Sequence, residues 1–191
     1  MKRSDWFAMG LILSMIVGCE NGSKFEHLVE KELSSGQRND SLFLNFYFGI
    51  TREEFFSRGW EQNKQGLIAQ GPRNQNIKYI MPNNEKGNSP IQMLFYPVFD
   101  DQNKIKTMNL TFNYSGWSPW GRKYFSDSLA IALQDTLERW YGGNEFVLMP
   151  VEEKEVWVKL DGNRLISLTI EDEQYVRGFI KDLTHPENKI Q

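Results

Sequence analysis

The first 40 residues fall into two parts that differ in hydrophobic pattern. Lys2 and Arg3 precede a largely apolar run over residues 6–17. This run is shorter than the roughly 20 apolar residues that a membrane-spanning helix needs. A basic start followed by a short apolar run and a small residue is typical of a secretory signal peptide. Residues 1–18 are therefore predicted to be a signal peptide.

Residues 19–40 are mostly polar and contain one short amphipathic stretch. Its apolar members are Phe25, Leu28, Val29 and Leu33. A segment with so few apolar side chains cannot bury enough surface to fold by itself. We therefore expect residues 19–40 to be a polar tether that precedes a folded domain.

The first half of that domain begins with a dense apolar run over residues 42–50. Thr51 and Glu54 then match a capping box, in which each residue satisfies a backbone N–H of the other at the start of a helix. This predicts a helix over residues 52–64 that ends near Gly66. Alternating apolar residues with short polar gaps then predict an antiparallel meander. Its strands are expected at residues 77–81, 91–98 and 105–114.

The second half begins with another helix, which Asp127 is expected to cap and Gly142-Gly143 to end. Its apolar or neutral residues recur at intervals of three and four, which places them on one face. They are Leu129, Ala132, Leu133, Thr136, Leu137, Trp140 and Tyr141. We expect Leu133 and Leu137 to face a sheet, and Gln134 and Glu138 to lie on the opposite side.

Strands are predicted again after this helix. The segments with strand character are residues 146–149, 155–160, 164–171 and 175–183. Asp161-Gly162-Asn163 is a tight-turn signal between the second and third of them. The last segment also matches a helical pattern, and we favour the strand.

The order of these elements predicts an α+β fold built from two successive helix-plus-antiparallel-meander units. The units cover about residues 42–114 and 123–183, and we expect them to pack as one helix-on-sheet domain over residues 41–185. Residues 186–191 are expected to form a tail. No residue-level repeat relates the two units, so only the order of elements is duplicated.

The residues Ile16-Val17-Gly18-Cys19 resemble the bacterial lipobox. The resemblance implies cleavage before Cys19 and a thioether-linked diacylglycerol on that cysteine. The protein would then be held by membrane lipid in the bacterial cell envelope, with the outer membrane as the expected location. The alternative is an ordinary secretory signal followed by a free cysteine.

The domain also bears a resemblance to a known fold. Its element order, and the residues Phe48-Gly49-Ile50-Thr51 leading into an acidic helix, resemble the β-lactamase-inhibitor-protein-like fold. Small outer-membrane assembly lipoproteins share that architecture, and single-domain lipoproteins of Bacteroidetes-type bacteria look similar. The match covers a few residues and therefore implies a fold without a function.

Composition argues against several classes of function. Cleavage before Cys19 would leave 20 basic and 24 acidic residues, which gives no electrostatic reason to expect a nucleic-acid partner. The single cysteine permits no internal disulfide or thiolate metal site. The two histidines, His27 and His185, lie in the tether and the tail rather than beside a nucleophile. We expect no metal, no cofactor and no catalytic site.

The most unusual stretch is a Gly/Pro/Ser-rich loop that carries two tryptophans, Trp117 and Trp120. Aromatic side chains displayed on a loop can stack on a sugar or anchor a protein partner. Alternatively, one or both fold down over the sheet as part of the core. The oligomeric state cannot be predicted from these patterns.

The function we expect is a non-enzymatic protein-interaction or assembly module, with another envelope protein as its partner. The alternative is a lipoprotein that binds a glycan or another small molecule through Trp117 and Trp120. An enzyme ranks last because no combination of residues supplies a nucleophile and a base.

The lipobox predicts that inhibition or loss of signal peptidase II leaves an uncleaved precursor. Mass spectrometry of the membrane fraction would detect residues 1–18 still attached to the chain. Inhibition of the ordinary signal peptidase serves as the control and should leave processing unchanged. Cleavage that continues without signal peptidase II would rule out the lipobox.

Overall fold

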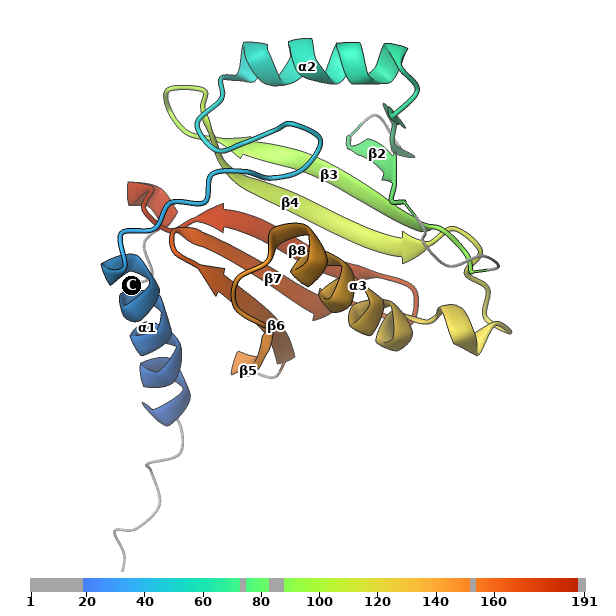
Figure 1. The fold of residues 1–191 in the computed structure, drawn as a ribbon. Coiled ribbons are helices and arrows are strands. Elements are labelled where there is room, and N and C mark those ends of the chain that lie inside the picture. Colours follow the sequence, from blue (N-terminus) through green and yellow to red (C-terminus); the bar gives the residue numbers. More distant parts are fainter. Residues whose placement is uncertain (1–18, 73–74, 83–87, 152–153, 189–191) are drawn as a thin grey trace, which may run out of the picture.

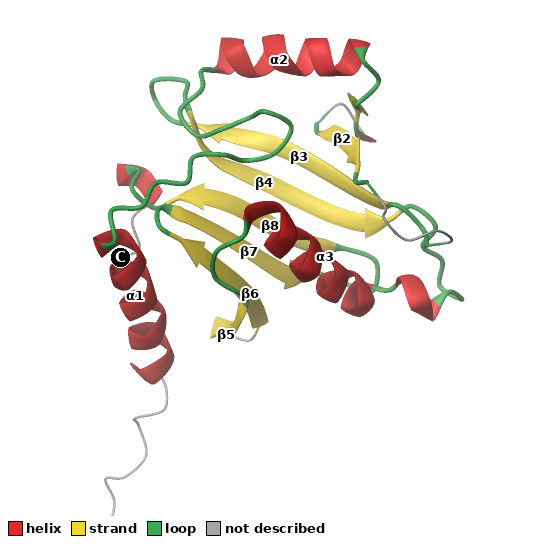
Figure 2. Ribbon diagram, viewed as in Figure 1, coloured by secondary structure: helices red, strands yellow, loops and turns green. Residues whose placement is uncertain are grey.

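The computed structural model describes residues 19–72, 75–82, 88–151 and 154–188, so the predicted signal peptide lies outside the described residues. Eight strands form one antiparallel sheet in the order β1-β2-β3-β4-β8-β7-β6-β5. Figures 1 and 2 show the strands as one twisted layer with helices around it. The predicted α+β, helix-on-sheet class is confirmed.

The first unit contains helix α2 and four strands. Their bounds are α2 Arg52–Lys64, β1 Ile68–Gln70, β2 Ile77–Ile80, β3 Ile91–Phe99 and β4 Ile105–Tyr114. The capping box is present, because the Glu54 N–H donates to Thr51 Oγ1 at 3.2 Å and the Thr51 N–H donates to Glu54 Oε2 at 2.8 Å. Strand β1 was not predicted, because three residues are too short to show an alternation.

The second unit repeats this order. Its elements are α3 Ser126–Tyr141, β5 Val147–Val151, β6 Lys154–Asp161, β7 Arg164–Ile170 and β8 Val176–Asp182. Two short 3-10 turns, Arg122–Tyr124 and Pro186–Asn188, flank the unit. The last segment is therefore a strand, as predicted.

Asp127 does not cap α3, so that prediction is wrong. The helix begins two residues earlier than a cap at Asp127 would place it, with Phe125 at the N-cap position and no side-chain capping bond. The Asp127 carboxylate instead accepts the N–H of Ser128 and pairs with Arg122 at 2.9 Å.

The two meanders join in the middle of the sheet, where β4 pairs with β8. Met108 lies opposite Ile180, and Leu110 lies opposite Gly178. The two units therefore share one continuous sheet.

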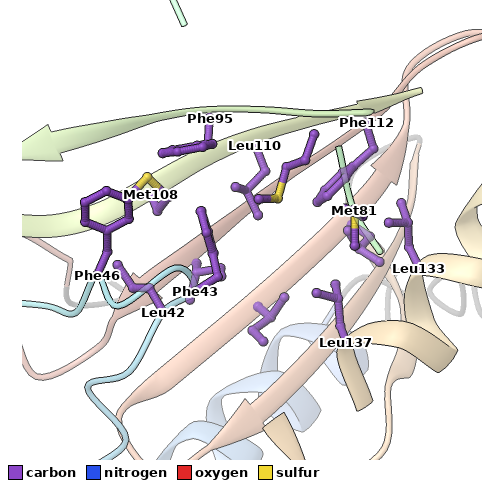
Figure 3. Close-up of a cluster of buried hydrophobic side chains, with 14 of the residues drawn as sticks. Leu42, Phe43, Phe46, Met81, Phe95, Met108, Leu110, Phe112, Leu133 and Leu137 are labelled. Carbon is purple, nitrogen blue, oxygen red and sulfur yellow. The ribbon is translucent and has the colours of Figure 1, made fainter. Parts of the chain in front are cut away.

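Helices α2 and α3 cover one face of this sheet and share a single core with residues 42–50. Phe46, Phe55 and Phe95 are fully buried there, and the Phe46 and Phe55 rings lie 4.7 Å apart. Residues 42–50 form an irregular segment whose apolar side chains fill the space between the helices and the strands (Figure 3). Side chains alternate between the two faces along a strand, so the large side chains of β3 and β4 point to this face. Residues 42–50 pack against them and are therefore part of the core.

The predicted spacer differs from the structure, because Cys19–Ser34 form helix α1. Phe25, Leu28 and Val29 pack against a second apolar cluster formed by β5, β6, β7 and Leu183, on the face of the sheet opposite α3. Apolar residues three and four apart form a stripe that this end of the sheet can bury. No helix in the described part of the chain is long and apolar enough to cross a membrane.

The two sides of α3 largely match the prediction. Leu133 and Leu137 are buried and point toward the sheet in Figure 3. Glu138, however, is not a free surface residue, because its Oε1 accepts the N–H of Phe146 at 2.8 Å. The chain turns back beside α3 before β5, which brings Phe146 within reach of Glu138.

We predict that Leu133→Ala or Leu137→Ala lowers the free energy of unfolding by about 2–5 kcal/mol, from lost burial and the cavity left behind. Ile131 lies on the same helix and is 64% exposed, so Ile131→Ala is the matched control and should change it by about 0.5 kcal/mol or less. Urea unfolding monitored by circular dichroism measures both. Equal losses at buried and exposed positions would contradict the helix-on-sheet packing.

Candidate functional site

A cavity of about 550 Å³ lies between the end of α3, residues 39–44, β2 and the start of β7. Four aromatic residues line it: Phe43, Tyr79, Trp140 and Tyr141. Arg164 is the one charged residue among its described lining residues. We call this site the Tyr141–Arg164 cavity.

Local structure brings these residues together. Trp140 and Tyr141 are the last residues of α3, and Arg164 is the first residue of β7, directly after the predicted tight turn. Residues 39–44 form the wall opposite these residues, and this wall is held in place because the N–H of Asn39 donates to Asn163 Oδ1 at 2.6 Å. The cavity therefore forms where α3 ends beside the β6–β7 hairpin.

Beneath the cavity lies a buried charge cluster made of Lys159, Asp161 and Arg164. Asp161 Oδ2 lies 2.9 Å from Lys159 Nζ and 3.3 Å from Arg164 Nη2. Lys159, which is 0% exposed, also donates to the carbonyls of Gly142 and Asn144. Its positive charge thus lies at the C-terminus of α3, where the helix dipole favours a cation.

Two glycines permit this arrangement. Gly143 has a φ of +75°, and a Cβ there would collide with the Asp161 carboxylate. Gly162 has a φ of +56°, and a Cβ there would collide with the backbone of Gln37. Both positions combine a left-handed backbone with a close approach, so only glycine suits them.

The buried charge cluster holds two cations and one carboxylate. Within the described ranges, Lys159 and Arg164 have no ion pair with any carboxylate other than Asp161. Buried charges are stable only when they are paired and hydrogen-bonded. Backbone carbonyls complete the pairing, because Gly142 and Asn144 accept from Lys159 and Ser41 accepts from Arg164.

Two buried side-chain atoms of residues that line the cavity, the Tyr141 hydroxyl and Arg164 Nε, have no hydrogen-bond partner among the described residues. Arg164 is 4% exposed and donates through Nη1 to the Ser41 carbonyl at 3.1 Å. Its guanidinium carbon lies 4.2 Å from the centre of the Tyr141 ring. A buried polar atom without a partner loses the hydrogen bond that water would have made.

Burial raises the pKa of Tyr141, and the neighbouring Arg164 acts in the opposite direction but does not overcome it. The phenol is therefore neutral at physiological pH and carries a proton that it can donate. Burial also raises the pKa of Tyr79 on the opposite wall.

The two tryptophans singled out from the sequence lie elsewhere. Trp117 is partly buried against Phe125, and its Nε1 donates to the Glu173 carbonyl at 3.2 Å. Trp120 is 91% exposed. Neither lines the Tyr141–Arg164 cavity. Trp117 is thus partly buried without joining the apolar core, and Trp120 is displayed to solvent.

The remaining candidate residues are also separate from the cavity. Cys19 is the first residue of α1, and its lipidation stays a prediction. His27 is exposed on α1, whereas His185 Nε2 lies 3.2 Å from Asp100 Oδ2. Across the described residues, no group of three His, Cys, Asp or Glu side chains is placed to hold a metal ion.

Sequence reasoning did not single out Tyr141, Arg164 or the buried charge cluster as candidates for a site. One signal was present in the sequence. In strand β6, Trp157 and Lys159 point to the same face and alternate with the apolar residues Val158 and Leu160. A lysine at an inward position needs a carboxylate partner, and Asp161 stands two residues along.

Comparisons with protein-family models, with curated proteins and with solved structures found no match to this chain.

Because Asp161 lies between two buried cations, we predict that Asp161→Asn lowers the free energy of unfolding by about 3–5 kcal/mol. Asp101 is exposed on a turn, so Asp101→Asn serves as the control and should change stability by about 0.5 kcal/mol or less. Urea unfolding of the two variants measures the difference. A small effect at Asp161 would mean that the cations find other partners when the carboxylate is lost.

Proposed function

We propose that this chain is a lipid-anchored protein of the bacterial cell envelope whose domain is a non-enzymatic binding module. Its ligand is a small molecule held in the Tyr141–Arg164 cavity. The observation that carries this proposal is the cavity itself, which four aromatic residues and Arg164 line where α3 ends beside the β6–β7 hairpin.

The composition of the cavity also supports binding. Its volume of about 550 Å³ lies within the 300–1,000 Å³ that is common for small-molecule sites. Aromatic rings provide contact area, and a few polar groups fix the orientation of a ligand. The described lining residues supply no carboxylate, imidazole or thiol that could act as a base or nucleophile.

The anchor supports the location of this function. The lipobox at Ile16-Val17-Gly18-Cys19 would keep the domain at the membrane surface, because two or three acyl chains make attachment effectively permanent. The outer membrane remains the location that we propose.

Binding of another envelope protein is the second candidate function. The observation that favours it is Trp120, because a tryptophan that is 91% exposed is typical of a residue that a partner covers. A glycan stacked on Trp120 would use the same exposure.

A matched pair of tryptophan variants separates these functions. The probes are three aromatic acids, benzoate, phenylacetate and indole-3-acetate, and the alcohols with the same rings, benzyl alcohol, 2-phenylethanol and tryptophol. Saturation-transfer NMR detects their binding to the protein in lipid nanodiscs, with empty nanodiscs as the background. We predict that Trp140→Ala weakens binding of the probes about tenfold or more, because Trp140 lines the cavity and buried aromatic contacts contribute strongly to affinity.

Trp120→Ala is the control and should leave probe binding unchanged. Trp140 is 38% exposed, so its loss should change thermal unfolding little. Binding that is lost in Trp120→Ala and retained in Trp140→Ala would place the site on the tryptophan loop. If none of the six probes binds the wild-type protein, the small-molecule function is wrong and a protein partner becomes the better candidate.

A further inference from the structure

We propose that a groove on the face of the sheet opposite α3 binds a neutral oligosaccharide. The groove has a volume of about 810 Å³ and lies over β3, β4, β7 and β8. We call it the sheet-face groove. It shares no described lining residue with the Tyr141–Arg164 cavity, so this inference goes beyond the proposed function and does not depend on it.

The pairing of β4, β8 and β7 arranges the side chains of the groove in two rows. Residues directly opposite on antiparallel strands have their side chains on the same face. The first row is Asn109, Phe179 and Ser167, and the second row is Thr111, Arg177 and Thr169. Neighbouring strands lie about 4.8 Å apart, so each row spans about 10 Å. That length suits a chain of sugars better than a single ring.

The rows point away from the core. Ile166 and Leu168 alternate with Ser167 along β7 and belong to the core under α3, so Ser167 faces the opposite side. Leu165 shares this side and packs in the apolar cluster that α1 covers. The sheet-face groove therefore begins where the cover of α1 ends.

The polar members of the rows are amides and hydroxyls with free hydrogen-bonding capacity. The side chains of Asn109, Thr111, Ser167 and Thr169 make no hydrogen bond to another described residue. Their oxygen and nitrogen atoms are not enclosed, because none is among the buried atoms that lack a partner. Hydroxyls and amides both donate and accept, as sugar hydroxyls do. The groove can therefore exchange paired hydrogen bonds with a sugar.

The charges favour a neutral ligand. Arg177 and Glu171 are the charged residues among the described lining residues, and they form an ion pair at 2.5 Å. Their charges cancel, so the groove offers no net attraction to an anion or a cation. An anion would have to compete with Glu171 for Arg177.

Aromatic rings complete the match to a sugar. Phe179 lies in the middle of the first row, and Tyr175 lines the groove just before β8. The C–H faces of sugar rings pack on aromatic rings, while the sugar hydroxyls reach the polar groups beside them. A purely apolar ligand would leave Asn109 and Ser167 without partners, which costs free energy.

Saturation-transfer NMR on the protein in lipid nanodiscs tests the site. The probes are maltotriose, cellotriose and triacetylchitotriose, and trigalacturonate is their anionic counterpart. At least one neutral trisaccharide is expected to bind, and more tightly than trigalacturonate. Asn109→Ala and Thr111→Val should each weaken its binding about fivefold or more, the effect of one lost hydrogen bond. Gln65→Ala, an exposed amide at the end of α2, is the control and should match the wild type.

Thermal unfolding and the tryptophan variants give independent readouts. Asn109→Ala and Thr111→Val should keep the wild-type midpoint, since neither side chain bonds a described residue. Binding that is lost together with a lowered midpoint would mean that these side chains stabilise the sheet, and the proposal would fall. Trp140→Ala should leave the trisaccharide bound, which separates this site from the Tyr141–Arg164 cavity.

Three results would overturn the proposal. Binding lost in Trp120→Ala and retained in Asn109→Ala would place the sugar on the tryptophan loop. Equal or tighter binding of trigalacturonate would exclude the neutral class. If no neutral trisaccharide binds, the groove is the ordinary solvated face of an antiparallel sheet or a surface for a protein. The aromatic probes of the Tyr141–Arg164 cavity report on the proposed function separately in every case.

Discussion

The ion pair between Lys159 and Asp161 is the interaction on which most of this architecture depends. It joins the end of α3 to the β6–β7 hairpin, because Lys159 donates to the carbonyl of Gly142 while it contacts Asp161. Asp161 in turn holds Arg164, whose guanidinium donates to the Ser41 carbonyl. One buried carboxylate thus connects a helix, a hairpin and the segment that begins the core. Burying these charges is costly unless every group is paired, so the pairing also fixes which conformation the region adopts.

Local sequence patterns predicted the helices and strands better than they predicted how these elements pack together. The Thr51–Glu54 capping box and the Gly142-Gly143 stop signal involve neighbours in the chain, so their physics is visible in the sequence. The alternation in residues 105–114 likewise depends on one strand. The Tyr141–Arg164 cavity could not be predicted in this way, because Ser41, Tyr79 and Tyr141 meet only after two units share a sheet.

The error at residues 19–34 has a similar cause. Phe25, Leu28 and Val29 form a stripe too small to stabilise an isolated helix. Its stability comes from the apolar side chains of β5 and β6, which alternate toward the face that α3 leaves open. Glu32 adds a polar contact, since it accepts the N–H of Gly162 at 3.0 Å. Whether these three residues form a docked helix depends on the surface that β5 and β6 provide, and the local sequence does not reveal that surface.

Helix α1 also changes the mechanics of attachment if Cys19 carries lipid as proposed. A flexible chain of about 20 residues would reach roughly 25 Å and let the domain tumble freely. Sixteen residues of helix span about 24 Å, nearly the same reach, but a helix docked on the sheet transmits torque. In Figure 1 this helix leads away from the sheet toward its N-terminal end. The bilayer would then restrict the rotation of the whole domain, so the mouth of the cavity would face a narrow range of directions relative to the membrane plane.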